Sequence, residues 1–160
     1  MTPTVDERFA SIIRARTEVI LPHLPADASL AQEQAHLAVG HLQILRAQFD
    51  TTHDFEREEL ADNIALASAL TAAIEGGTQT QTALAVLVTA GNADGAINAR
   101  DRLRGLNRAV EALVKAVSTD GSTAAKAALR TIILDHERVR VLKDRRWFLP
   151  FGFDTMEDAA

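Results

Sequence analysis

The sequence contains no cysteine, no tyrosine and a single tryptophan, and these absences narrow the possible functions. Without cysteine the chain can form no disulfide, no thiolate metal site and no cysteine nucleophile. The Gly-x-Gly-x-x-Gly, Walker and Gly-x-Ser-x-Gly patterns are also missing. The chain therefore lacks the common sequence signatures of dinucleotide sites, phosphate-binding loops and serine hydrolases, and we predict neither a cofactor nor a metal.

Long apolar runs are absent as well. The longest, residues 83–88, has six members, whereas a membrane-spanning helix needs about 20. The first residues, Met1 to Arg8, do not combine a basic segment with an apolar one, as a secretory signal would. We expect a soluble cytoplasmic protein without a membrane partner. The formal net charge of −5 disfavours general binding to nucleic acid.

What the chain does contain is a series of amphipathic segments. Apolar residues recur every three or four positions, which is typical of helices with one buried face. Thr4 and Glu7 form a capping-box pattern at the first helix start, and Pro22 and Pro25 end that helix. The pair Gly76-Gly77 predicts a left-handed helix cap. We predict an all-α fold, an up-down bundle of five or six helices over residues 1–146, followed by an irregular tail over 147–160.

Two segments carry the most specific patterns. Residues 78–90 combine threonines with a β-branched apolar run, yet no other segment alternates to pair with a strand, so a short buried helix is predicted. The second helix carries a heptad seam beside a second apolar stripe. The seam contains Ala31, Ala35, Ala38, Leu42, Leu45 and Phe49, and the stripe contains Leu30, Leu37 and Ile44.

Four of the seven aromatic residues lie close together near the C-terminus, at Trp147, Phe148, Phe151 and Phe153. Their large apolar area favours burial. Two interpretations remain open. The rings fold back to cover an open end of the bundle, or they dock into a second subunit or another protein, where aromatic anchors dominate binding energy.

Histidine and arginine side chains supply the candidate ligand pocket. His136 occupies a core-stripe position of the last helix, and His41 lies at the edge of the seam of the second helix. Arg16 interrupts the apolar stripe of the first helix and is suited to bind an anion. Together they predict a pocket between helices with proton-transfer capacity. The alternative is that each histidine is a core residue whose hydrogen bonds are satisfied by a neighbour.

Other polar patterns are better explained by exposed surface. Glu33 and His36 have the spacing of a di-iron motif, but a di-iron bundle needs two copies and this chain has one. The arginines between Arg100 and Arg108 are explained by pairing with the acidic start of the third helix.

Several short segments resemble a little-characterised family of small all-helical bacterial proteins encoded near phosphotransferase-like kinases and acyl-CoA dehydrogenases. They are Glu18-Val19-Ile20-Leu21-Pro22, the alanine-rich second helix with His36, Leu106-Asn107-Arg108, and the run from Leu129 to Asp135. The chain departs from that pattern in its ending from Trp147 to Phe153. The resemblance implies an accessory role and brings no catalytic residue.

The sequence thus favours a non-enzymatic helical interaction or accessory module that binds itself or another protein, because no catalytic constellation accompanies its wide apolar faces. The alternative is a small-ligand binder or enzyme with a pocket lined by His41, His136 and Arg16.

Overall fold

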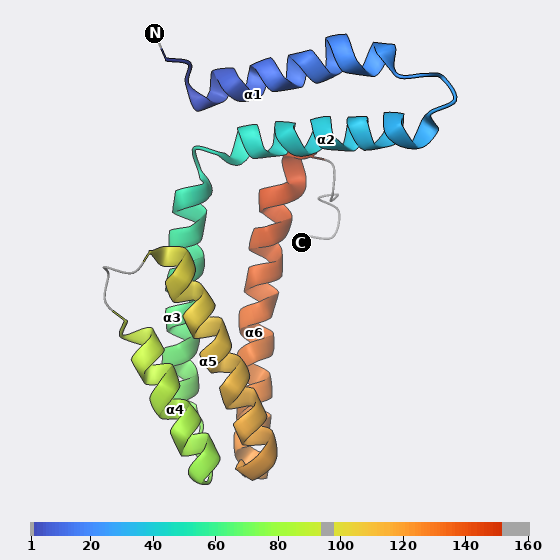
Figure 1. Ribbon diagram of the computed structural model, residues 1–160. Helices are drawn as coiled ribbons and strands as arrows, with labels where there is room; N and C mark the ends of the chain where they lie inside the picture. Colours follow the sequence, from blue (N-terminus) through green and yellow to red (C-terminus); the bar gives the residue numbers. More distant parts are fainter. Residues whose placement is uncertain (1, 94–97, 152–160) are drawn as a thin grey trace. The chain divides into compact units, whose positions relative to one another are not determined.

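The computed structural model describes residues 2–93 and 98–151, and in these ranges it contains six α-helices and no strand (Figure 1). The all-α prediction is confirmed, as is the helix predicted over residues 78–90. The same part of the chain has no helix that combines the length and apolarity needed to cross a membrane. The helices are α1 (Val5–Arg14), α2 (Ser29–Gln48), α3 (Thr52–Ala73), α4 (Thr78–Gly91), α5 (Ala99–Asp120) and α6 (Thr123–Phe148).

The chain divides into two compact units, Met1–Thr52 and His53–Ala160. The sequence pattern predicts one bundle over residues 1–146, and no pattern in it indicates a division at this position. The polar turn before α3 is the only signal near it, and the same kind of turn separates helices within one unit.

The N-terminal unit is a helical hairpin. The predicted capping box opens α1: the Thr4 backbone N donates to the Glu7 carboxylate at 2.7 Å, and the Glu7 backbone N donates to Thr4 Oγ1 at 3.2 Å. A π-helical segment, Ala15–Ile20, and a 3-10 turn, Leu21–His23, continue it to the prolines. α2 returns antiparallel to α1 (Figure 1).

The helices of the hairpin contact each other through an ion pair and a pair of aromatic rings. The guanidinium of Arg46 donates to both carboxylate oxygens of Asp6, at 2.5 and 2.9 Å. The rings of Phe9 and Phe49 meet edge to face with centroids 6.2 Å apart.

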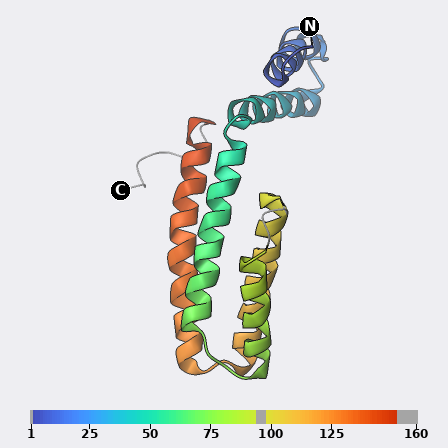
Figure 2. The same ribbon diagram turned by 90° about the vertical axis from the view of Figure 1, so that its left-hand side faces the viewer.

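The C-terminal unit is a four-helix bundle in which α3 lies beside α6 and α4 beside α5 (Figure 2). Its helices bury leucine, alanine and valine at helical spacing, so the core forms where the four faces meet. The largest fully buried side chains are Leu70, Leu87, Leu106, Leu113, Val117 and Thr80. All the core residues belong to this unit.

One end of the bundle is tied by Asp120, the last residue of α5. Its carboxylate accepts hydrogen bonds from the backbone N of Gln79 at 2.7 Å and of Thr80 at 3.1 Å, and from Thr80 Oγ1 at 2.5 Å. These bonds hold the pKa of Asp120 below its usual value, with the Thr80 hydroxyl as the largest cause. Asp120 therefore caps α4, whose own N-cap residue, Gly77, has no side chain.

The glycines at this end serve a different purpose from the one predicted. Gly77 has φ −72° and ψ −167°, so the left-handed cap expected from the sequence is wrong for this residue. A Cβ at Gly77 would lie 2.6 Å from Asp120 Oδ2, and one at Gly76 would lie 2.6 Å from the Thr80 side chain. Gly77 therefore leaves room for Asp120 at the end of α5, and Gly76 leaves room for the Thr80 side chain of α4.

Candidate functional site

The aromatic end begins inside the bundle. α6 runs through Trp147 and Phe148, and a 3-10 turn, Leu149–Phe151, follows it, so the irregular tail starts later than predicted. The Trp147 ring stacks on Phe55 of α3, with centroids 4.3 Å apart and an interplanar angle of 26°. Trp147 is thus engaged within its own unit. The Phe148 side chain is exposed, Phe151 is half-buried, and Phe153 lies outside the described residues.

The three residues predicted to line one pocket belong to different units. Arg16 is half-buried in the π-helical segment and His41 is exposed on α2, both in the N-terminal unit. His136 lies on α6 in the C-terminal unit. A shared pocket of Arg16, His41 and His136 therefore stays a prediction.

His136 itself lines a shallow cavity of about 250 Å³ between α3 and α6. Its side chain is only 13% exposed, and its Nδ1 lies 3.6 Å from a carboxylate oxygen of Glu137. Both ring nitrogens are buried and form no hydrogen bond within the described part of the chain. Since buried polar groups are normally satisfied, the ring has hydrogen-bonding capacity to offer. The rest of the lining is mainly aliphatic: Asp62, Ala65, Leu66, Ala69, Ile132 and Val139.

Charged residues extend from this cavity toward the aromatic end, along the line where α3 and α6 meet. Lys143 forms an ion pair with Asp62. Burial raises the pKa of the Glu59 carboxyl, and the nearby guanidinium of Arg140 opposes that rise. Lys143 pairs across the two helices, whereas Arg140 forms ion pairs with Glu137 and Asp144 of its own helix. These ion pairs account for the basic side chains of the row without a ligand.

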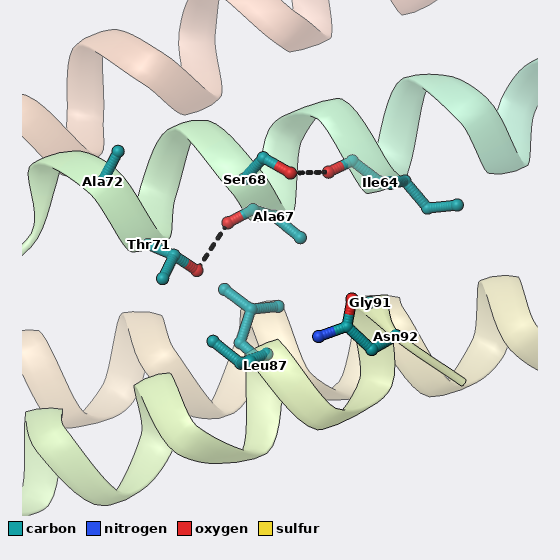
Figure 3. Close-up of a pocket in the computed structure, with 9 residues that line it drawn as sticks. Ile64, Ala67, Ser68, Thr71, Ala72, Leu87, Gly91 and Asn92 are labelled. Carbon is teal, nitrogen blue, oxygen red and sulfur yellow. Dashed lines mark hydrogen bonds between the residues drawn. The ribbon is translucent and has the colours of Figure 1, made fainter. Parts of the chain in front are cut away.

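A second, larger hollow of about 350 Å³ lies between α3 and α4 (Figure 3). Its polar lining comes mainly from Ser68 and Thr71, but both hydroxyls donate to carbonyl oxygens of their own helix, those of Ile64 at 3.0 Å and Ala67 at 2.8 Å. With these donors already used, the hollow presents mostly apolar side chains and no converging reactive groups.

The most unusual surface belongs to the hairpin. None of the described residues of the N-terminal unit, 2–52, is buried. Eight large apolar side chains there are each at least 42% exposed, and we refer to them together as the apolar hairpin surface. They are Val5, Ile12, Val19, Ile20, Leu30, Leu37, Leu45 and Phe49.

The helical seam and stripe of α2 were correctly recognised as apolar, but the sequence did not reveal that they remain uncovered within this unit. Ala35, Ala38 and Leu42 of the seam are half-buried, whereas Leu45 and Phe49 remain about half exposed. α1 and its π-helical continuation pack along one side of α2, and the rest of its wide apolar face stays exposed within this unit.

The structure also shows the contacts of two polar patterns from the sequence, the arginines of α5 and the Glu33–His36 spacing. Arg100 forms an ion pair with Glu56, as expected from the acidic start of the third helix. His36 Nδ1 lies 2.8 Å from the carbonyl oxygen of Gln32 in its own helix. Over residues 2–93 and 98–151, no group of three histidine or acidic side chains is arranged to hold a metal ion.

Comparisons with models of protein families, with curated proteins and with solved structures found no significant match to this chain. The family resemblance based on short segments therefore stays a prediction, and the functional argument depends on the surfaces described above.

Proposed function

We propose that this protein is a non-enzymatic helical interaction module, an accessory or self-associating protein that makes its contacts through the N-terminal hairpin. The observation that carries the proposal is the apolar hairpin surface in a unit without a single buried described residue. Helices gain most of their stability from packing an amphipathic face. A hairpin without a core is stabilised when another surface covers that face.

The size of the surface supports the same function. Given the exposed fractions of its eight side chains, it presents roughly 700 Å² of apolar area. The eight side chains lie on more than one side of the hairpin, so this area is a sum and not one continuous patch. A typical stable interface buries about 800 Å² on each partner. The hairpin therefore exposes about as much apolar area as one partner buries in a protein contact.

Hydrogen exchange tests this proposal. In dilute protein, the amides of α2 should exchange much faster than those of α5, whose Leu106, Leu113 and Val117 are fully buried. Addition of whatever covers the apolar hairpin surface should slow exchange in α2 and leave α5 unchanged. If α2 is already as protected as α5 in the dilute monomer, the surface is covered by its own chain and the proposal is refuted.

The aromatic end is a second contact element in this proposal. Phe148 is 41% exposed at the end of α6, and Phe151 follows in the 3-10 turn. Trp147 contributes to the packing of α6 on α3. A Phe148→Ala substitution should weaken partner binding, as measured by titration of the partner.

A small-ligand binder is the second candidate function, favoured by the two unsatisfied nitrogens of His136 beside an aliphatic cavity. Such a cavity suits a small molecule with an apolar body and a hydrogen-bonding head group. The imidazole NMR signals of His136 should shift on addition of indole or benzoate, and His136→Leu should abolish binding. Unchanged signals with both probes would leave this second candidate without support.

A further inference from the structure

We infer that the outer face of α2 pairs with the same face of a second copy of this chain. This inference rests on the proposed function and names the partner of the hairpin. The face consists of the apolar stripe Leu30, Leu37 and Ile44, with Gln34 and His41 between its members, and we refer to it as the outer stripe.

The outer stripe points away from α1. Arg46 reaches α1 through its hydrogen bonds to Asp6. Leu37 precedes Arg46 by nine residues, which is two and a half helical turns, so it lies on the opposite side of α2. Leu37 is 50% exposed and Leu30 is 68% exposed, whereas Ile44 is half-buried. α1 therefore leaves Leu30 and Leu37 uncovered, and covering them requires a surface from outside the hairpin.

The spacing of the outer stripe is that of a helix-pairing seam. Leu30, Leu37 and Ile44 are seven residues apart, and Gln34 and His41 follow the two leucines by four residues each. Positions with these spacings form the contact line between two packed helices. The line extends for fourteen residues, or about 21 Å, along a helix of twenty residues.

Charge and hydrogen-bonding chemistry favour an identical partner. Among the twenty residues of α2, Glu33 is the only aspartate or glutamate and Arg46 the only lysine or arginine, and Arg46 is already paired with Asp6. Two copies of a neutral stripe do not repel each other, whereas two copies of a charged one would. Glutamine and histidine side chains can each act as donor and acceptor. In a parallel two-fold pairing each can therefore bond to its own copy, and in an antiparallel one centred on Leu37 the glutamine of one copy lies near the histidine of the other.

Symmetry places Leu37 at the centre of the contact. It is the middle member of the stripe, so in a two-fold pairing of either orientation it meets its counterpart. The stripe is shorter than a standard interface, and we expect a dissociation constant on the order of 10 µM.

Sedimentation of the full chain from about 1 µM to about 500 µM tests the inference. The wild type should shift from the 17.3 kDa monomer to twice that mass. Leu37→Glu and Leu37→Lys should each weaken dimerisation at least tenfold, because each places like charges face to face. An equimolar mixture of the two variants should form a dimer again, which a variant that had merely failed to fold could not do. The control Gln43→Glu, on another face of α2, should dimerise like the wild type.

Three outcomes would overturn the inference. They are a wild type that stays monomeric at the highest concentration, a Leu37→Glu variant that dimerises like the wild type, and a mixture of the two charge variants that does not associate. Hydrogen exchange then separates this inference from the proposed function. A monomer with unprotected α2 amides refutes the second copy alone and leaves the apolar hairpin surface for another protein, whereas a monomer with protected α2 amides refutes both.

Discussion

The Thr80–Asp120 contact offers the most specific test of how the C-terminal bundle is held together. Thr80 is fully buried at the start of α4, and its hydroxyl donates to the carboxylate of Asp120 at 2.5 Å. Thr80→Val removes this donor while keeping the shape of the side chain. The backbone N–H groups of Gln79 and Thr80 still reach Asp120 in the variant, so the substitution isolates one hydrogen bond of three.

The expected magnitude follows from two opposing terms. A hydrogen bond to a charged group contributes about 1.5–3 kcal/mol to stability. The valine methyl that replaces the Thr80 hydroxyl is apolar and buried, which returns roughly 0.8 kcal/mol. We therefore expect Thr80→Val to lower the free energy of unfolding by about 1–2 kcal/mol at neutral pH. Thr82→Val is the matched control, because Thr82 is exposed on the same helix and its hydroxyl bonds only to the carbonyl of Thr78.

Urea unfolding followed by the fluorescence of Trp147 measures the effect, since this is the only tryptophan and it lies in the C-terminal unit. The pKa of Asp120 is lowered in the folded state. Its contribution is therefore complete above the ordinary carboxyl pKa of about 3.9 and declines as the pH falls through the lower, folded value. The difference between wild type and Thr80→Val should narrow over that acidic range. Equal losses for Thr80→Val and Thr82→Val at neutral pH, or a difference that does not change on acidification, would refute the reasoning.

Three further predictions concern the same unit. Gly77→Ala should be destabilising because its Cβ would lie 2.6 Å from Asp120, whereas Gly105→Ala, with no atom near, should raise stability by about 0.5–1 kcal/mol; urea unfolding compares them. Phe55→Leu should shift the emission of Trp147, because the ring stacked on the indole is lost; an unchanged spectrum counts against that contact. Glu59→Gln should raise the free energy of unfolding most above the raised folded pKa of Glu59, where the half-buried carboxylate is charged, and least in acid; a pH series of unfolding curves checks the sign.

Much of the secondary structure could be predicted from the sequence, because capping residues and apolar spacing mark the helices locally. The capping box of Thr4 and Glu7 marks the start of α1, and Ser122 caps α6 by accepting from the Ala125 backbone N at 3.0 Å. α4 was the least certain helix, since threonine and valine favour strands. The segment is a helix, and its buried residues follow helical spacing: Thr80, Ala83, Leu84 and Leu87.

The contacts between segments far apart in the sequence could not be predicted from such local patterns. Asp120 caps a helix that starts 42 positions earlier, with N–H groups at Gln79 and Thr80 that no local pattern connects to it. The glycines Gly76 and Gly77 therefore suggested an ordinary helix end, when their real requirement is space for Asp120 and Thr80. A single sequence gives no information about how closely two helices approach each other.

The candidate sites show the same limit: the sequence reveals an apolar pattern but not the surface that covers it. Periodicity correctly indicated that one face of α2 is apolar, and that face is wider than the part of it that packs against α1. A stripe such as Leu30, Leu37 and Ile44 shows that the helix carries an apolar line, yet it gives no information about which surface covers that line. In a bundle core the partner is another helix of the same chain. Where a unit has no buried described residue, the same stripe instead becomes evidence for a contact outside the unit. The glutamine and histidine side chains within it are the basis for proposing a second copy as the partner, because groups that can both donate and accept hydrogen bonds can pair with their own kind.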